Sequence, residues 1–84
     1  MITGSQIRAA RSALKWSGYK LAKIGGVSLR TVIKIEAQDG LPDARISTVS
    51  KLKSCFEAAG IEFIGTPDDG PGIRIRPVLS EGAN

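Results

Sequence analysis

The stretch from Leu21 to Glu36 constrains the fold more than any other part of the 84-residue chain. Its first half ends in apolar residues, and Gly25 and Gly26 then supply turn conformations that residues with side chains resist. Ser28 suits the N-cap of a second helix, because its hydroxyl can accept from the free amides of the next turn. Helix, glycine-containing turn and second helix form the helix-turn-helix layout, which predicts a second helix that enters the major groove of DNA.

Helical periodicity continues on both sides of this stretch. Thr3 and Gln6 match a capping box, so the first helix is predicted to start at Thr3. Ser17 can cap the next one. The remaining helices are predicted over 18–24, 29–37 and 45–59, the last capped by Asp43 or Ser47.

After Gly60 the apolar pattern changes from helical to alternating. Two short runs, IEFIG and GIRIRP, flank the turn-forming segment TPDDGPG and predict a β-hairpin over 61–78, with a loop longer than the tightest types. An isolated hairpin is marginal in water, so it must pack on the fourth helix or pair with the hairpin of a second chain. Residues 79–84 are expected to form a flexible tail. The predicted fold is therefore mainly α, with a four-helix domain over 1–60 and a short C-terminal hairpin.

Positive charge is concentrated in the predicted helices. The chain holds 12 Lys and Arg against 8 Asp and Glu, a net charge of +4. Residues 1–60 carry ten basic side chains against four acidic ones, whereas residues 61–84 carry two arginines against four acids. A surface that contacts phosphates needs this distribution. A solvated basic face without a partner fits the charge equally well.

The residue types present exclude several kinds of chemistry. Cys55 is the only cysteine and histidine is absent, so no intrachain disulfide or Cys-based zinc site is expected, and the commonest general base is missing. No nucleophile elbow or phosphate-binding loop appears, and we expect no enzyme, metal or cofactor. No apolar run approaches ~18 residues and no signal peptide is evident, which predicts a cytoplasmic protein that does not enter membranes and lies on the nucleoid through DNA binding.

Several sequence elements occur together at fixed spacing: QIRAAR, W-S-x-x-x-L-A and G-V-S-x-x-T-V-x-x-I-E, then a Gly-Pro loop and a fourth helix. Over about residues 3–60 they resemble the lambda-repressor-like (XRE-type) helix-turn-helix family. The ending AAGIEFI and the Gly-rich hairpin with an IRIR strand resemble a bacterial subgroup of small regulators in that family. The resemblance implies a lambda-repressor-like DNA-binding domain with its recognition helix at about 28–37.

The resemblance also implies roles for individual residues. A helix-one arginine of the family pairs with the glutamate that ends the recognition helix, which corresponds here to Arg11 and Glu36. The family reads bases from positions that correspond to Leu29, Arg30 and Lys34, with Thr31 and Ile33 near the groove wall. An arginine can hold guanine O6 and N7 with two hydrogen bonds, whereas Leu29 can touch a thymine methyl or exclude water. Charge and placement alone suggest Ser17, Lys20, Lys23 and Arg45 as contacts to the DNA backbone, and the full set expected there is Ser17, Gly18, Tyr19, Lys20, Lys23, Ser28, Thr31 and Arg45. An ordinary solvated surface is the alternative for each.

Gly18 departs from the family pattern. Many members carry Gln or another polar side chain there, at the start of the second helix, and bond the DNA backbone with it. In this chain the contact must come from the Gly18 amide, Ser17 or Tyr19, or be absent. Free amides at a helix start suit a phosphate.

The sequence thus predicts a DNA-binding transcription regulator, with repression as the expected outcome, that binds a pseudo-palindromic operator as a homodimer. The dimer contact is expected on the fourth helix and hairpin, through Phe56, Ile61, Phe63, Ile73 and Ile75. The alternative is an antitoxin-type regulator that also binds a protein partner through its C-terminal part.

Overall fold

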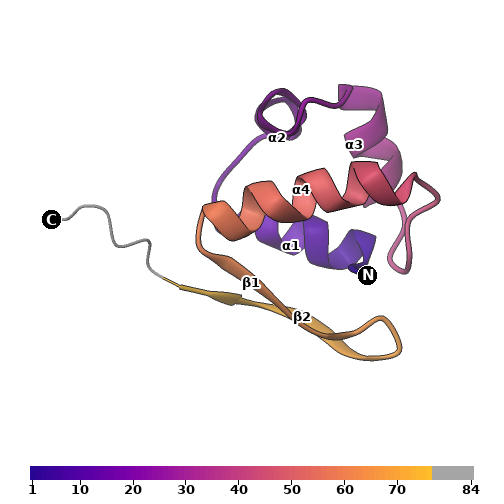
Figure 1. The fold of residues 1–84 in the computed structure, drawn as a ribbon, viewed down its shortest axis with the longest axis vertical. Coiled ribbons are helices and arrows are strands. Elements are labelled where there is room, and N and C mark those ends of the chain that lie inside the picture. The colour runs from indigo at the N-terminus through magenta and orange to yellow at the C-terminus, as the bar shows by residue number, and fades with distance from the viewer. Residues whose placement is uncertain (77–84) are drawn as a thin grey trace, which may run out of the picture.

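The computed structural model describes residues 1–76, which form four helices followed by a two-stranded antiparallel hairpin. The helices are α1 (Gly4–Ala13), α2 (Gly18–Gly25), α3 (Leu29–Glu36) and α4 (Ile46–Ala58), and the strands are β1 (Ile61–Thr66) and β2 (Asp69–Ile75). In Figure 1, α2 and α3 lie at one end of the molecule and the hairpin lies on the far side of α1 and α4. The predicted order of four helices and a hairpin is confirmed. The predicted tail at 79–84, and the last two residues of the predicted hairpin, lie outside the described residues.

Side-chain caps start the first two helices as the sequence predicts. The Thr3 hydroxyl accepts from the Gln6 amide while the Gln6 side chain accepts from the Thr3 amide, which completes the capping box of α1. Ser17 caps α2 by accepting from the amide of Lys20. Each cap satisfies an amide that has no partner inside its helix, and so fixes where the helix begins.

The start of α4 differs from the prediction. Neither Asp43 nor Ser47 caps this helix, because Arg45 holds the N-cap position and makes no side-chain cap hydrogen bond. Ser47 lies inside the first turn, and the Asp43 carboxylate lies 4.0 Å from the Lys34 ammonium of α3 instead. The backbone amides in the first turn of α4 therefore donate no hydrogen bond to the side chain of the N-cap residue.

The two glycines at the end of α2 have different structural roles. Gly26 is the C-cap of α2 with φ +67°, a left-handed conformation that residues with a Cβ adopt at a cost. Gly25 is buried against α4, where a Cβ would lie 2.7 Å from a methyl carbon of Leu52. The pair therefore both reverses the chain and lets α2 approach α4 closely.

Phe56 of α4 occupies the centre of the core. Its ring stacks on Trp16 at a centroid distance of 5.6 Å and meets Phe63 of β1 edge-on at 5.9 Å. The fully or almost fully buried apolar residues come from all four helices, the N-terminal residues and β1: Ile2, Ile7, Ala10, Leu21, Ala22, Val32, Ile35, Val49, Leu52, Phe56 and Ile61. One continuous core thus joins the helical part to the hairpin.

The strand register confirms one prediction and corrects another. Ile61 pairs with Ile75 and Phe63 with Ile73, so these four side chains lie on one face of the hairpin as predicted. The predicted long loop is wrong, because Thr66 already pairs with Asp69 and only two residues, Pro67 and Asp68, connect the strands.

A bulge explains the tighter loop. The register shifts between Ile64 and Thr66, and Gly65 and Gly70 have φ of +76° and +62°. A Cβ on Gly65 would lie 2.1 Å from the Gly70 carbonyl oxygen, so only glycine allows this approach. Residues typical of turns are therefore part of the strands.

Gln6 fastens the hairpin to α1. Its buried side-chain amide donates to the carbonyls of Ile64 (3.0 Å) and Gly72 (2.9 Å), one on each strand. Its side-chain oxygen accepts from the amide of Thr3 at 2.9 Å. The oxygen and the nitrogen of this buried amide both have hydrogen-bond partners. One side chain therefore links the start of α1 to both strands of the hairpin.

Gln6→Ala is expected to lower the free energy of unfolding by about 2 kcal/mol or more, since it strips partners from buried backbone groups at both ends of the side chain. Urea unfolding followed by circular dichroism measures the loss. Gln38→Ala is the matched control, because Gln38 accepts one exposed hydrogen bond from the Asp43 amide. Equal destabilisation by the two substitutions would contradict the role given to Gln6.

Candidate nucleic-acid interface

The outward face of α3 carries the three side chains predicted to read bases. Val32 and Ile35 bury the inner face of this helix, so Leu29, Arg30 and Lys34 are left exposed. The side chain of Arg30 makes no hydrogen bond or ion pair with any of residues 1–76. A guanidinium without a partner on an exposed helix face is available to an external acceptor.

Arg11 and Glu36 form the predicted ion pair and hold α3 against α1. Two hydrogen bonds join them, Nε to Oε2 at 2.8 Å and Nη2 to Oε1 at 2.9 Å, which is the bidentate geometry of a guanidinium on a carboxylate. The third nitrogen of Arg11 donates to the Trp16 carbonyl at 2.8 Å. The two side chains are only 25% and 10% exposed. The hydrogen bond to Glu36 raises the pKa of the Arg11 guanidinium above its ordinary value.

The starts of α2 and α3 lie next to each other. A Cβ placed on Gly18, the first residue of α2, would lie 3.5 Å from a methyl carbon of Leu29, the first residue of α3. The oxygen of Ser17 accepts the α2 cap, so its hydroxyl proton is free to be donated. Tyr19 is among the most exposed large side chains of the described residues. Several predicted backbone contacts therefore share one region with the predicted base contacts.

A hollow of about 200 Å³ brings together three other predicted residues, Thr31, Lys34 and Arg45. The Thr31 hydroxyl lies 2.9 Å from that of Ser28, which caps α3. The 4.0 Å pair between Lys34 and Asp43 borders the same hollow and is exposed. Exposed pairs of this kind contribute ~0–1 kcal/mol, so Lys34 can exchange its partner for a phosphate or a base.

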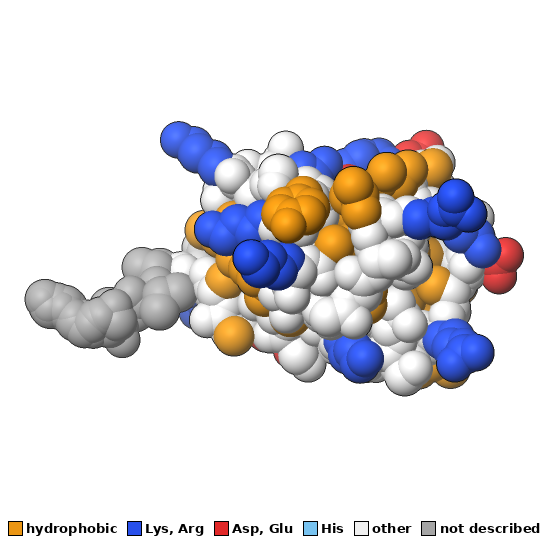
Figure 2. All heavy atoms as spheres, turned by 90° about the horizontal axis from the view of Figure 1, so that it is seen from above, with side chains coloured by type: hydrophobic (Ala, Val, Ile, Leu, Met, Phe, Trp, Pro, Cys, Tyr) orange, Lys and Arg blue, Asp and Glu red, His pale blue; other side chains and the backbone are white. Residues whose placement is uncertain are grey.

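Two lysines on the outer side of α2 differ in how they are held. The Lys20 ammonium lies 5.5 Å from the centre of the Trp16 ring, a cation–π contact. Lys23 is exposed in the last turn of α2, more than one helical turn from Gly18, and no described contact places it beside the other predicted residues. Figure 2, which looks down on the end formed by α2 and α3, shows Lys and Arg side chains around the rim of this face and few acidic ones.

Ile33 belongs to this face although the sequence prediction left it out of the base-reading set. It is 61% exposed, and helical geometry places it between Leu29 and Arg30 on the outward side of α3. The resemblance had placed Ile33 only near the groove wall, and its exposure marks it as part of the same outward face as Leu29.

Two of the five residues predicted for a dimer interface cannot form one. Phe56 is enclosed by Trp16 and Phe63, and Ile61 is directed into the same core, so neither offers surface to a second chain. Phe63 and Ile73 are half-buried and pack against the core. Ile75 is 63% exposed and is the residue of this set with accessible apolar surface.

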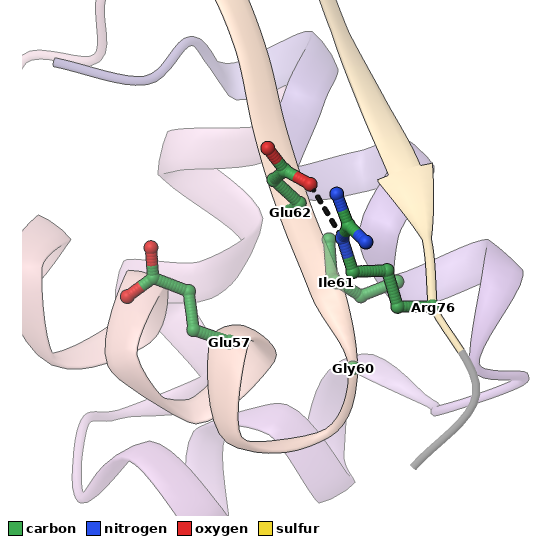
Figure 3. A pocket seen from close by; sticks show the side chains of 5 residues that line it. All are labelled: Glu57, Gly60, Ile61, Glu62 and Arg76. Atoms are coloured by element: carbon green, nitrogen blue, oxygen red, sulfur yellow. Dashed lines mark hydrogen bonds and ion pairs between the residues drawn. The ribbon is translucent and has the colours of Figure 1, made fainter.

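A second hollow, of about 280 Å³, lies where α4 meets β1 and is lined by Glu57, Gly60, Ile61, Glu62 and Arg76. Figure 3 shows the Glu62 carboxylate facing Arg76 and the Glu57 carboxylate lying apart from them. Arg76 donates to Glu62 at 2.6 Å, and this hydrogen bond is the main cause that lowers the pKa of Glu62. Glu62 is thus engaged by Arg76, and Glu57 lies 4.0 Å from the ammonium of Lys53 instead.

Comparison with known proteins adds no family. No model of a protein family matches the chain, and no curated protein is similar to it. Among residues 1–76, no helix has both the length and the apolar character to cross a bilayer, and no three His, Cys, Asp or Glu side chains meet as a metal site.

Arg11→Ala is expected to destabilise the fold by about 2 kcal/mol, less than the ~3–5 kcal/mol of a fully buried pair because both groups keep some contact with water. Lys53→Ala on α4 is the control, since Lys53 lies 4.0 Å from the exposed Glu57 and its loss should cost ~0–1 kcal/mol. Urea midpoints compare the two variants. Coincident midpoints would contradict a structural role for the Arg11–Glu36 pair.

Proposed function

We propose that this chain is a DNA-binding transcription regulator that inserts α3 into the major groove and binds its operator as a homodimer. The observation that carries the proposal is the outward face of α3, where Arg30, unpaired within residues 1–76, stands on a helix that the Arg11–Glu36 pair holds against α1. A rigid helix with a free guanidinium suits the bidentate recognition of guanine. The role is that of a binding protein rather than an enzyme.

Phosphate contacts around α3 support the proposal. Ser17 and the Gly18 amide stand at the start of α2, and Arg45 stands at the start of α4, so two helix N-termini flank the recognition helix. Helix N-termini attract phosphate through free amides and the helix dipole. The absence of a side-chain cap on α4 leaves its first amides to such a ligand. The resemblance to lambda-repressor-like regulators agrees with this arrangement.

The proposed dimer forms through the outer edge of β2. The Arg76 amide donates to the Gly60 carbonyl at 2.7 Å, and hydrogen-bonded and non-bonded pairs alternate along an antiparallel ladder. The amides and carbonyls of Ile73 and Ile75 consequently point away from β1. A strand edge with unpaired backbone groups is a template for another strand. Antiparallel pairing of β2 with its copy, centred on Ile73, gives a four-stranded sheet with two-fold symmetry.

The positions of charged and apolar side chains favour a β2–β2 register that is centred on Ile73. With Ile73 at the centre, Arg74 of each copy stands opposite Gly72 of the other, so like charges do not face each other. The accessible apolar surface of Ile75 becomes covered. One module buries too little surface for high DNA specificity, and doubling it through a two-fold axis matches a pseudo-palindromic site.

Arg30→Ala should relax the base preference at one position of each half-site, because a bidentate contact to guanine is worth about 1–3 kcal/mol of discrimination. Arg45→Ala should instead weaken binding to all sequences alike and reduce the salt dependence by about one phosphate contact, because Arg45 stands beside Lys34 at the start of α4. Selection of duplexes from a random pool, repeated for each variant, measures both effects. An unchanged motif for Arg30→Ala would contradict base reading by this residue.

Ile75→Asp should convert the dimer to a monomer, because it places a charge in the apolar part of the proposed β2 contact. The exposure of Ile75 in the single chain means that the fold itself should survive. Sedimentation equilibrium gives the mass of the species in solution, with circular dichroism as the check on folding. Ile46→Asp, at an equally exposed isoleucine of α4, is the control that should remain dimeric. A dimeric Ile75→Asp protein would exclude this interface.

A further inference from the structure

The recognition face of α3 combines charged and apolar side chains in a way that hydrogen bonding to bases does not explain. Leu29 and Ile33 are four residues apart and lie on neighbouring positions of one helix face. They are 41% and 61% exposed. Both are large and apolar, and neither belongs to the buried face of α3, which Val32 and Ile35 form.

The position of Ile33 ties it to the same ligand as the charged residues. Successive residues of an α-helix turn by about 100°, so Ile33 lies about 60° to one side of Arg30 and Lys34 lies about 40° to the other side. A surface that meets Arg30 head-on therefore has Ile33 as its neighbour on the side of Leu29. Leu29 lies at the edge of the face, where it borders Gly18 at the start of α2.

The chemistry of the major groove narrows what these two side chains can contact. The edges of the bases present hydrogen-bond donors and acceptors there, and the C5-methyl of thymine is the apolar group. An isoleucine placed against a polar edge would remove water from it without replacing the hydrogen bond, which costs free energy. Against a thymine methyl it buries apolar surface on both sides.

We propose that Ile33 and Leu29 read the C5-methyl groups of thymines, so that each half-site contains thymines beside the base pair that Arg30 contacts. This inference rests on the proposed function, since it requires α3 in the major groove. It adds a sequence preference: the operator combines a guanine with neighbouring thymines.

Uracil substitution tests the inference with the unmodified protein. Replacing one thymine by uracil removes the methyl group and keeps the base pairing, and burial of one such group is worth about fourfold in affinity. We expect this loss at one or two positions of each half-site in the selected duplex, measured by fluorescence anisotropy. Uracil at thymines outside the half-sites is the control and should have no effect.

Alanine variants assign the effect to residues. The Ile33→Ala protein should have the same affinity for duplexes that carry thymine or uracil at one position of the half-site. The Leu29→Ala protein should lose the difference in affinity at another position. Both side chains are exposed, so the variants should unfold at about the urea concentration of the parent.

A selected motif whose affinity is unchanged by uracil at every position would overturn the inference and leave the proposed function standing. Uracil sensitivity that persists in both alanine variants would overturn the assignment to these residues. Failure to select any motif would overturn both the inference and the proposed function.

Discussion

The guanidinium of Arg11 is the contact on which the arrangement of the first three helices depends. It binds Glu36 at the end of α3 through two hydrogen bonds and the Trp16 carbonyl just before α2 through a third. Because a guanidinium is planar and its donors have fixed directions, these bonds set orientation as well as distance. The outward direction of α3, and with it the position of Arg30, follows from this one side chain together with the buried face of the helix.

The hairpin is fixed by an equally local device at the opposite side of the core. Gln6 satisfies backbone groups of α1, β1 and β2 with one buried amide, and Phe63 meets Phe56 across the core. Both strands are thereby fixed to the helical part, while the outer edge of β2 is left unpaired among the described residues. The molecule thus separates two surfaces: the α2–α3 end proposed for DNA, and the β2 edge proposed for a second copy.

Local signals made most of the fold predictable. The capping box, the serine caps and the change from helical to alternating periodicity gave the helices and the hairpin in their correct order. Features that depend on contacts between residues distant in the sequence were not predicted. Gly65 and Gly70 form strand and bulge only because they approach each other, and the burial of Phe56 depends on Trp16 and Phe63. At the proposed interface, the resemblance predicted the Arg11–Glu36 pair and placed Ile33 near the groove wall, whereas the exposure of Ile33 could be known only from the fold.

Two symmetry-related copies of the chain are proposed to read one DNA sequence through α3. The sequence content of the duplexes that the unmodified protein retains from a random pool at about physiological salt tests this reading. We expect a two-fold symmetric motif with half-sites about one helical turn apart and a guanine in each. Retention that is sensitive to salt but carries no motif would contradict sequence reading by α3, and the helix would then be a scaffold for another partner.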